Sequence, residues 1–386
     1  MRIAYVTETY PPDLNGVSLT VERTVAYLRD RGHGVDLVRP AQPGESRGPC
    51  EDEWRSAGWP IPMYPEMRFG FEWPAVLARR FKATRTQLVH VATEGPLGRA
   101  AIVAARRVGL PVTSDFRTNF HHYSRYYRLG WMEPVISRYL RAFHNATDRT
   151  FVPSEQSRRE LRGRGFERTL VAGRGVDMVR FSPQHRDPAL RLAWGAADGP
   201  VLLYVGRLAA EKNVTLALRA YRQVRETHRG ARMIVAGDGP CAQALRRDFP
   251  DVRFLGSQTG HALAATYASA DLFVFPSESE TFGNVTLEAL ASGLPVVAFD
   301  HAAAGELVTH GVNGWLVSPA DAEGFVAACC AMTDSLDASR SASRAARRSV
   351  ASHHWNRVLR AFEHQLTDAL HEAGRSRVAE TVTARA

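Results

Sequence analysis

Lysine is nearly absent from this chain, although basic residues outnumber acidic ones. Lys82 and Lys212 are the two lysines among 49 basic residues, which face 40 acidic residues and leave a formal net charge of +9. A positive excess is typical of proteins that bind nucleic acid or anionic membranes. The sequence has no finger pattern, no recognition-helix pattern and no aromatic-basic stacking motif, which argues against a nucleic-acid partner.

Cysteine is also scarce, and its four positions lack metal-binding spacing. Cys50 and Cys241 stand alone, whereas Cys329 and Cys330 are adjacent within a helical pattern. This usage indicates structural thiols in a reducing cytoplasm. No apolar run approaches membrane-spanning length, and Met1 leads into a strand pattern without a signal-peptide pattern. We therefore expect a cytoplasmic protein, or one held peripherally at the inner face of the cytoplasmic membrane.

One basic cluster leaves two interpretations open. It consists of Arg79, Arg80, Lys82 and Arg85, which share a helical pattern. A solvated helix face is the favoured interpretation. The alternative is a basic helix that rests on anionic lipid.

Apolar strand patterns alternate with amphipathic helical patterns along nearly the whole chain. A length of 386 residues suits two domains of ordinary size. The alternation predicts an α/β fold with two Rossmann-like domains, each a doubly wound parallel sheet. Such sheets bind ligands beyond the carboxyl ends of their strands, so we expect a site in a cleft between the two facing domains.

The predicted strands fall into two series. Those of the first series are Arg2–Val6, Val35–Val38, Leu88–Val91, Val112–Phe116, Thr150–Val152 and Thr169–Val171. Those of the second series are Val201–Val205, Arg232–Ala236, Val252–Leu255, Leu272–Phe275, Pro295–Phe299 and Gly314–Val317.

Domain boundaries follow from the same patterns. The N-terminal domain is expected at residues 1–178, a linker at 179–199 and the C-terminal domain at 200–350. Two prolines, Pro183 and Pro188, indicate the linker. A final helix at 351–372 precedes a polar tail at 373–386, which we expect to be disordered.

Two glutamates eight residues apart form the most informative motif. Glu280 lies on a polar loop after an apolar strand pattern, and Glu288 lies in the second turn of a helix that opens near Gly283. The backbone N–H groups and the dipole at that helix N-terminus suit a phosphate. Carboxylates cannot hold an anion, but they can accept hydrogen bonds from hydroxyls. A ligand with hydroxyls at both ends and phosphate between them is a nucleoside diphosphate sugar.

A second loop carries two cations. Arg207 and Lys212 follow the strand at Val201–Val205. Arg207 can bind phosphate oxygens through its forked guanidinium, and Lys212 can act as a point charge. This pair would stabilise a departing diphosphate without a metal, and no acidic pair with metal-ligand spacing lies beside it. An ordinary strand-to-helix loop with surface charges is the alternative of equal weight.

Two glycine-containing turns also follow predicted strands. Gly16 lies between the first strand and the first helix, where a backbone without a side chain can approach a ligand. Neither this turn nor the Arg207 loop has the GxGxxG pattern, which disfavours a nicotinamide-dependent oxidoreductase. Asp238, in a Gly-Asp-Gly-Pro turn, either accepts from a ligand hydroxyl or caps the following helix, and the cap is favoured.

Polar groups gather at one strand end of the first series. The run from Asp115 to Arg125 includes Arg117, His121 and His122, and such a run is a candidate part of a cleft. Taken singly, each histidine fits a structural or surface position better.

Taken together, these motifs and their order resemble the retaining glycosyltransferases of family four, which have the GT-B fold. The likeness covers nearly the whole chain, and Pro276–Ala289 is its most specific part. The stretch from Asp115 to Ser154 is similar to a branch that contains GDP-mannose-dependent α-mannosyltransferases and sulfoquinovosyltransferases.

The resemblance implies a role for each candidate residue. Glu280 would contact the hydroxyls of the donor hexose, and Glu288 would bind the ribose hydroxyls. Arg207 and Lys212 would hold the diphosphate. The other donor contacts would come from Gly16, Asp238, Phe282, Gly283, Asn284 and Val285. The final helix, from about His353 to His371, would cross back onto the N-terminal domain.

Arg117 departs from the family pattern. Many relatives place a histidine of an aromatic-His-Thr motif near the transferred sugar, whereas this chain has Phe116-Arg117-Thr118. Arginine cannot act as a base, but Arg117 could bind an anionic group of the acceptor or donor. His121 or His122 could supply what that histidine supplies.

The resemblance predicts transfer of a hexose, with retention of the α configuration, to a hydroxyl of a saccharide or lipid acceptor. GDP-mannose is the first choice of donor, followed by UDP-sulfoquinovose or UDP-glucose, and no metal cofactor is expected. A glycosidase that uses Glu280 and Glu288 is an alternative of another class. A non-catalytic protein that binds a nucleotide sugar or a lipid headgroup is a further alternative.

Overall fold

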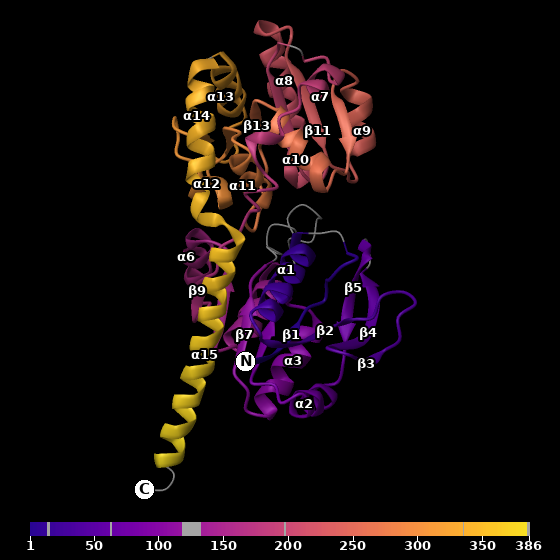
Figure 1. The fold of residues 1–386 in the computed structure, drawn as a ribbon, viewed down its shortest axis with the longest axis vertical. Helices are drawn as coiled ribbons and strands as arrows, with labels where there is room; N and C mark the ends of the chain where they lie inside the picture. Colours follow the sequence, from indigo (N-terminus) through magenta and orange to yellow (C-terminus); the bar gives the residue numbers. More distant parts are fainter. Residues whose placement is uncertain (14–15, 62–63, 118–132, 197, 335, 384–386) are drawn as a thin grey trace. The chain divides into compact units, whose positions relative to one another are not determined.

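The structure is a computed structural model of the 386-residue chain. It describes the chain except for residues 14–15, 62–63, 118–132, 197, 335 and 384–386, and it does not describe the side chains of 61–67, 335–340 and 376–386. The described chain forms two units, coloured along the sequence in Figure 1. Unit 1 draws on residues 1–117, 133–173 and 358–383, and unit 2 draws on residues 174–357.

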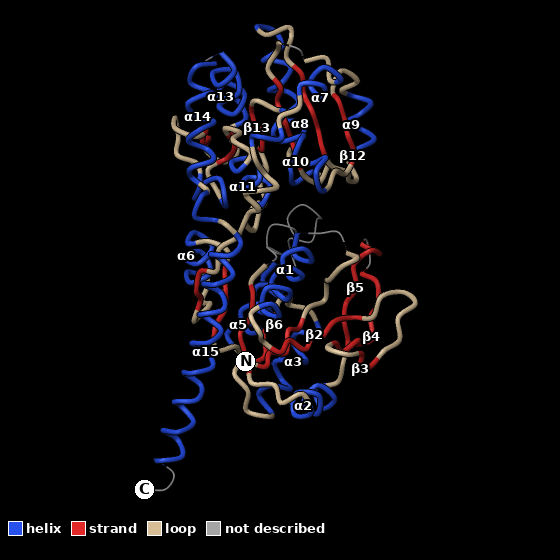
Figure 2. Tube along the Cα trace, viewed as in Figure 1, coloured by secondary structure: helices blue, strands red, loops and turns tan. Residues whose placement is uncertain are grey.

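Unit 1 is built on a mainly parallel sheet, whose strands are red in Figure 2. The strand order is β3-β4-β2-β1-β6-β7-β8-β9, and β5 pairs with β4. The parallel core consists of β1 (Arg2–Val6), β2 (Gly34–Pro40), β6 (Leu88–Val91), β7 (Val112–Asp115), β8 (Arg149–Val152) and β9 (Thr169–Val171). Its main helices are α1 (Gly16–Asp30), α2 (Pro74–Ala83), α3 (Pro96–Arg107), α5 (Glu133–Asn145) and α6 (Glu155–Gly163).

Helices cover both faces of this sheet, because successive residues of a strand point to opposite sides. In β1, Ala4 and Val6 join residues of α2 and α3 in one apolar cluster. Ile3 and Tyr5 join residues of α1 and of the C-terminal helix α15 (Trp355–Thr383) in another. The alternation along one buried strand therefore produces the doubly wound arrangement that the sequence predicts.

Three strands of unit 1 were not predicted: β3 (Gly48–Cys50), β4 (Glu53–Ile61) and β5 (Tyr64–Phe71). Gly58 and Gly70 pair across β4 and β5. A Cβ built on Gly58 would lie 2.9 Å from the Pro40 Cβ, and one built on Gly70 would lie 2.8 Å from a Leu97 methyl carbon. Only glycine fits this closely packed face. Because glycine has a low strand propensity, the sequence pattern does not predict the hairpin.

Helix α15 completes the core of unit 1. Phe362, Leu366 and Ala369 are buried in the cluster that contains Ile3 and Tyr5. The helix continues to Thr383, into the stretch for which the sequence predicts a disordered tail.

A polar anchor also holds α15. The Glu363 carboxylate accepts hydrogen bonds from the Tyr27 hydroxyl at 3.0 Å and from Arg31 Nε at 3.2 Å. It also forms a hydrogen bond of 2.9 Å with His33 Nε2. These hydrogen bonds lower the pKa of Glu363, although burial opposes them as the largest single influence.

Unit 2 contains a six-stranded parallel sheet in the order β12-β11-β10-β13-β14-β15. The strands are β10 (Val201–Val205), β11 (Arg232–Ala236), β12 (Arg253–Gly256), β13 (Leu272–Phe275), β14 (Val296–Phe299) and β15 (Gly314–Val317). The main helices are α8 (Val214–Thr227), α9 (Ala242–Asp248), α10 (Gly260–Ser269), α11 (Asn284–Ala291), α12 (Ala302–Leu307), α13 (Ala322–Asp334) and α14 (Leu336–Ser349). Each strand lies within one residue of its predicted bounds.

The segment predicted as a linker folds as part of unit 2. It contains the 3-10 helix η2 (Pro183–His185) and helix α7 (Pro188–Ala193). Each proline is the first residue of its helix, where a missing N–H costs nothing, so these prolines start helices rather than mark a flexible connection. Arg186 and Arg191 bind the Asp271 carboxylate at 2.7 and 2.9 Å.

The predicted fold class, two doubly wound parallel α/β domains, is confirmed. The expectation of a cleft concerns the placement of the units relative to one another and stays a prediction. Within the described ranges, no helix combines the length and apolar character needed to cross a bilayer.

We expect Phe362→Ala to lower the free energy of unfolding of unit 1 by about 3–5 kcal/mol, the usual cost of truncating a buried phenylalanine. Phe362 is 6% exposed, and its ring centroid lies 5.2 Å from that of Phe151. Urea unfolding followed by circular dichroism measures the change. Leu192→Ala, at a residue that is 65% exposed, is the control, and equal midpoints for the two variants would contradict the packing role of α15.

Candidate active site

The strand order of unit 2 reverses between β10 and β13. The chain runs outward from β10 through β11 to β12 and then returns to β13, on the other side of β10. Loops that leave neighbouring strands at such a reversal diverge, and α/β sheets bind ligands there. The two motif loops, residues 206–213 and 276–283, leave the carboxyl ends of these two strands. The sequence motifs therefore meet where the fold favours a ligand.

An ion pair joins the two loops. Lys212 Nζ donates to Glu280 Oε1 at 2.6 Å and to the Ser279 carbonyl oxygen at 2.7 Å. The Ser277 hydroxyl also donates to Glu280 Oε1, at 3.1 Å. The Lys212 and Glu280 side chains are 12% and 17% exposed, so both are ordered by protein contacts and still reach solvent.

Local backbone geometry positions Lys212. It ends a 3-10 turn at Ala210–Lys212, and Asn213 then takes a left-handed conformation with φ of 49° before α8 begins. The Asn213 amide donates to Glu278 Oε1 at 3.2 Å, and the Glu278 N–H donates to the Glu211 carbonyl at 3.2 Å. These bonds fix one loop against the other beside the Lys212–Glu280 pair.

Arg207 lies at the start of the same loop and is half-buried. The buried Tyr204 hydroxyl donates to its carbonyl oxygen at 3.1 Å. Two glycines allow the strand ends to approach, because a Cβ built on Gly237 would lie 1.9 Å from the Gly206 carbonyl oxygen. Their backbones have φ of 151° at Gly206 and 150° at Gly237. The Gly-Asp-Gly-Pro turn thus packs closely against the start of the Arg207 loop.

The N-terminus of α11 lies beside Glu280. Gly283 is the N-cap, with φ of 98°, and has no side chain to cap the helix. A Cβ at Gly283 would lie 3.6 Å from Glu280 Cγ. Phe282 is buried, and its carbonyl accepts from the Ala303 N–H at 2.7 Å. Asn284 and Val285, the first two residues of α11, are half-buried, as expected for a helix start that offers its N–H groups to an anion.

Glu288 lies one turn further along α11, beside Tyr267 of α10. The Tyr267 hydroxyl donates to Glu288 Oε2 at 3.0 Å. Burial raises the pKa of Glu288 to about 7, and the hydrogen bond from Tyr267 opposes that rise. Tyr267 is completely buried, and burial raises its own pKa well above 10, so its hydroxyl stays a donor.

Tyr267 and Ser277 were missed by the sequence analysis. Tyr267 sits in an alanine-rich helix, where an aromatic residue predicts only core packing. Ser277 belongs to the glutamate motif, and its position directly after β13 was the available signal.

Asp238 does not cap α9, which corrects the favoured interpretation. The N-cap of α9 is Cys241, without a side-chain bond. The exposed Asp238 carboxylate instead accepts from the Gly239 N–H at 2.8 Å. The turn is held by its glycines, so the carboxylate is not required to stabilise the helix.

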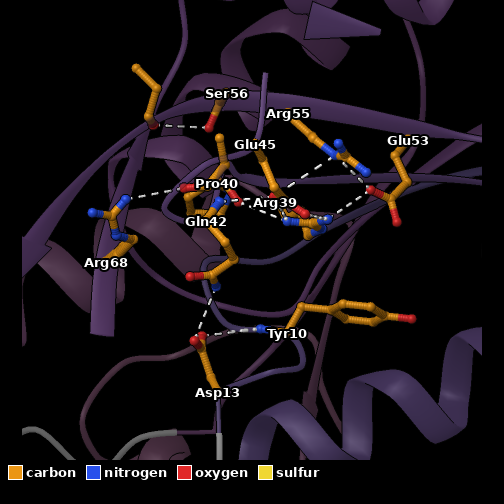
Figure 3. Close-up of polar contacts among 12 residues, drawn as sticks. Tyr10, Asp13, Arg39, Pro40, Gln42, Glu45, Glu53, Arg55, Ser56 and Arg68 are labelled. Atoms are coloured by element: carbon orange, nitrogen blue, oxygen red, sulfur yellow. Dashed lines mark hydrogen bonds and ion pairs between the residues drawn. The ribbon is translucent and has the colours of Figure 1, made fainter. Parts of the chain in front are cut away.

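In unit 1, the loop that precedes Gly16 is tied to the end of β2 (Figure 3). Asp13 accepts from the Tyr10 N–H at 3.4 Å and from the Gln42 side-chain amide at 3.0 Å. The Gln42 N–H donates to Glu45, which also accepts two hydrogen bonds from the buried Arg39 guanidinium. The bonds from Arg39 hold the pKa of Glu45 at about 2. Gly16 itself begins α1 and is exposed.

Arg117 is buried at the end of β7. Its Nε donates to Asp115 Oδ2 at 2.6 Å, its Nη2 also contacts that oxygen, and Asp115 bonds to His90 Nε2 at 3.3 Å. The Arg117 N–H donates to Glu94 at 3.3 Å, while the buried Nη1 has no hydrogen-bond partner in the described structure. Arg117 thus neutralises Asp115 and keeps one unused donor.

Of the two candidate histidines, neither can be placed, since His121 and His122 lie outside the described residues.

Glu8 and Glu94 were also missed, although each lies in the loop that follows a buried strand. They lie at the strand-order reversal of unit 1, after the adjacent strands β1 and β6. Glu8 Oε1 accepts from the Leu97 N–H at 2.8 Å. Burial raises the pKa of Glu8 to about 8, and the charge of Glu94 contributes to that rise. Glu8 therefore holds a proton at neutral pH.

Comparison with known proteins gives one consistent result. Residues 14–180 match the family model described as "Glycosyltransferase Family 4", and residues 199–335 match "Glycosyl transferases group 1". The chain is 34% identical over 363 residues to a GDP-mannose-dependent alpha-mannosyltransferase of Mycolicibacterium smegmatis, covering 92% of this chain and 94% of that protein. It is 28% identical to the sulfoquinovosyl transferase SQD2 of Arabidopsis thaliana, covering 92% and 71%.

A solved structure supports the fold. The sucrose-phosphate synthase of Thermosynechococcus elongatus matches with a TM-score of 0.78 at 19% identity, over 97% of this chain and 100% of that one. The predicted GT-B fold is confirmed.

Glu8→Gln should reduce the pH dependence of stability. The pKa of Glu8 is raised from 4.5 to about 8 by folding, so its stabilising contribution is complete below about pH 4.5 and is lost as pH rises through 8. The variant keeps an oxygen for the Leu97 N–H but cannot ionise. We expect its thermal midpoint to rise relative to that of the wild type between about pH 4.5 and 8 and to keep a constant difference above pH 8, whereas Glu323→Gln, at an exposed side chain, should follow the wild type. Parallel curves for Glu8→Gln and the wild type would exclude a buried protonated Glu8.

Proposed function

The chain belongs to glycosyltransferase family 4, and we propose that it transfers mannose from GDP-mannose to a hydroxyl acceptor, with retention of configuration. The Lys212–Glu280 pair beside the N-terminus of α11 is the observation that carries this proposal. It combines a cation and a helix N-terminus for a diphosphate with a carboxylate for sugar hydroxyls. The mannosyltransferase relatives support GDP-mannose as the donor.

Charge stabilisation is the main contribution of these residues to the proposed reaction. When the glycosidic bond to the donor breaks, negative charge develops on the β-phosphate oxygen. Arg207, Lys212 and the N–H groups at the start of α11 stabilise that charge, and preorganised groups of this kind are the largest source of rate acceleration in many enzymes. No metal is needed for this step, because the cations already lie on the loop.

The two glutamates take separate parts of the donor. Glu280 accepts from hexose hydroxyls, and its bond to Lys212 fixes the orientation of its carboxylate. Glu288 accepts from the ribose hydroxyls, with Tyr267 fixing its carboxylate. The leaving phosphate deprotonates the acceptor hydroxyl on the same face of the sugar, so neither glutamate serves as a nucleophile. The ion pair also makes Glu280 unsuited to be the acid of a glycosidase.

Donor residues outside these loops keep the roles implied by the family. Phe282, Gly283, Asn284 and Val285 present the helix start to the diphosphate, and Asp238 offers an exposed carboxylate. The role of Gly16 depends on the placement of unit 1 relative to unit 2 and stays a prediction.

A UDP-sugar is the second candidate donor. The unused and buried Nη1 of Arg117 favours a ligand with an anionic group, and the sulfonate of UDP-sulfoquinovose is such a group. The likeness to a sulfoquinovosyl transferase supports the same alternative. Neither UDP-glucose nor GDP-mannose carries such a group on its sugar.

Lys212→Ala should reduce turnover of GDP-mannose by about 100-fold or more, the usual effect of removing one preorganised donor to a developing charge. Release of GDP measures the rate, with saccharide and lipid acceptors tested in parallel. Arg229→Ala removes an exposed cation of unit 2 that lies outside the two motif loops, and serves as the control. A rate for Lys212→Ala within a factor of two of the wild type would refute the diphosphate role.

One series of thermal-shift measurements tests both the identity of the donor and the protonation of Glu288. GDP-mannose should raise the thermal midpoint more than UDP-glucose or UDP-sulfoquinovose, because preferential binding stabilises the native state. Since the pKa of Glu288 is about 7, the ionised acceptor form is lost as pH falls, and the shift should shrink between pH 8 and 6. Glu288→Gln should show a smaller shift without that pH dependence. A larger shift with a UDP-sugar would replace GDP-mannose by the second candidate.

A further inference from the structure

An exposed group of aromatic side chains lies on one part of unit 1. Trp59, Phe69, Phe71 and Trp73 are 56%, 41%, 44% and 66% exposed. Across the described chain, Tyr139 is the other large aromatic residue with comparable exposure. A contiguous apolar patch at the surface generally marks an interaction site. We name these four residues the aromatic ladder.

The hairpin geometry turns the ladder outward. Trp59 pairs directly with Phe69 across β4 and β5, and Phe71 follows Phe69 by two residues, so all three share one face. The opposite face carries Gly58 and Gly70, which pack closely on Pro40 and Leu97. The ladder is therefore not the core face of the hairpin.

The rings are packed edge to face. The Trp59 and Phe71 centroids are 6.2 Å apart with an interplanar angle of 75°, and those of Phe71 and Trp73 are 5.8 Å apart at 82°. A sugar stacks on a flat aromatic face, whereas neighbouring rings among Trp59, Phe71 and Trp73 are nearly perpendicular to one another. Amphipathic rings of this kind, tryptophan above all, favour the interface between membrane and water.

Exposed cations adjoin the ladder in the chain. Helix α2 begins at Pro74, directly after Trp73, and Arg79 and Lys82 are exposed on it. Arg85, just after the helix, is exposed as well.

Arg80, which belongs to the same basic cluster in the sequence, is not one of the exposed cations. Its guanidinium binds Asp36 through two hydrogen bonds of 3.0 and 2.6 Å, and its side chain is only 15% exposed. The sequence groups Arg80 with Arg79, Lys82 and Arg85 on one helix, for which a solvated face is favoured and contact with anionic lipid is the alternative. The buried Asp36 carboxylate on β2 instead binds Arg80.

We propose that the aromatic ladder and the exposed cations Arg79, Lys82 and Arg85 form one surface that binds an anionic lipid bilayer. Rings inserted at the interface and cations above anionic headgroups are the two contributions that such a surface combines. A second copy of this chain is a poorer occupant, because a symmetric contact would bring the same cations together. The inference goes beyond the proposed function and does not depend on the donor.

Vesicle sedimentation tests the surface with the full chain. The wild type should bind vesicles that contain phosphatidylglycerol and should bind phosphatidylcholine vesicles weakly. We expect two double variants to weaken vesicle binding roughly ten-fold or more: Phe71→Ser with Trp73→Ser, and Arg79→Gln with Lys82→Gln. Each ring that inserts into the bilayer interface and each cation above the headgroups contributes to binding. The charge variant alters exposed helix positions only, so it tests the surface even if the aromatic variant folds poorly.

Matched control variants show whether vesicle binding depends on these positions or only on the net charge and exposed apolar area of the protein. Arg229→Gln with Arg253→Gln removes the same charge, and Val179→Ser with Leu192→Ser removes exposed apolar groups. Both should bind vesicles like the wild type, and all variants should keep the GDP-mannose thermal shift.

Several results would overturn the proposal. One is absence of wild-type binding to anionic vesicles, and another is equal binding by surface and control variants. Self-association that the Phe71→Ser, Trp73→Ser variant abolishes, without vesicle binding, would assign the ladder to a second copy. If a soluble oligosaccharide bound to the wild type but not to the Phe71→Ser, Trp73→Ser variant, and vesicles did not bind, the aromatic ladder would be assigned to an oligosaccharide ligand. Failure of the donor assay with intact vesicle binding would reject the proposed function and leave this surface standing.

Discussion

The ion pair between Lys212 and Glu280 is the interaction on which the candidate site depends. It joins the loops after β10 and β13, which otherwise diverge at the strand-order reversal, and it lies beside the uncapped start of α11. Because both side chains are mostly shielded from water, removal of one partner leaves the other poorly compensated. The pair therefore fixes the two loops against each other at the edge of the sheet where the fold favours a ligand.

The strand-order reversal in unit 1 uses the opposite electrostatic solution. There Glu8 and Glu94 lie together, and burial keeps Glu8 protonated instead of pairing it with a cation. Arg117 binds Asp115 through two of its side-chain nitrogens and reaches Glu94 only through its backbone N–H. Unit 2 thus holds an ion-paired carboxylate at its strand-order reversal, whereas unit 1 holds a neutral acid against the start of α3.

The sequence predicts the periodic parts of this molecule well. Strands of unit 2 fall within one residue of their bounds, because buried parallel strands read as short apolar runs between glycine-rich turns. The β4–β5 hairpin escapes detection since its packed face is made of Gly58 and Gly70. At the site, the motif residues Glu280, Lys212 and Gly283 are visible in the sequence. The bond between Glu280 and Lys212 is not, because the two residues are 68 positions apart and only the sheet order brings them together. Tyr267 and Glu8 act through burial, which a local pattern does not report.

Close packing at the glycine face explains why the hairpin can carry exposed aromatic rings at all. Gly58 and Gly70 bring its backbone against Pro40 and Leu97, so backbone packing and the pairing of β4 with β2 hold the hairpin without help from Trp59 or Phe71. Rings that add nothing to the core leave a large apolar surface in water, which is unfavourable for an isolated chain. Their edge-to-face packing recovers part of that cost, yet about half of each ring remains exposed. The aromatic ladder is therefore better explained by a partner that covers it than by the stability of unit 1.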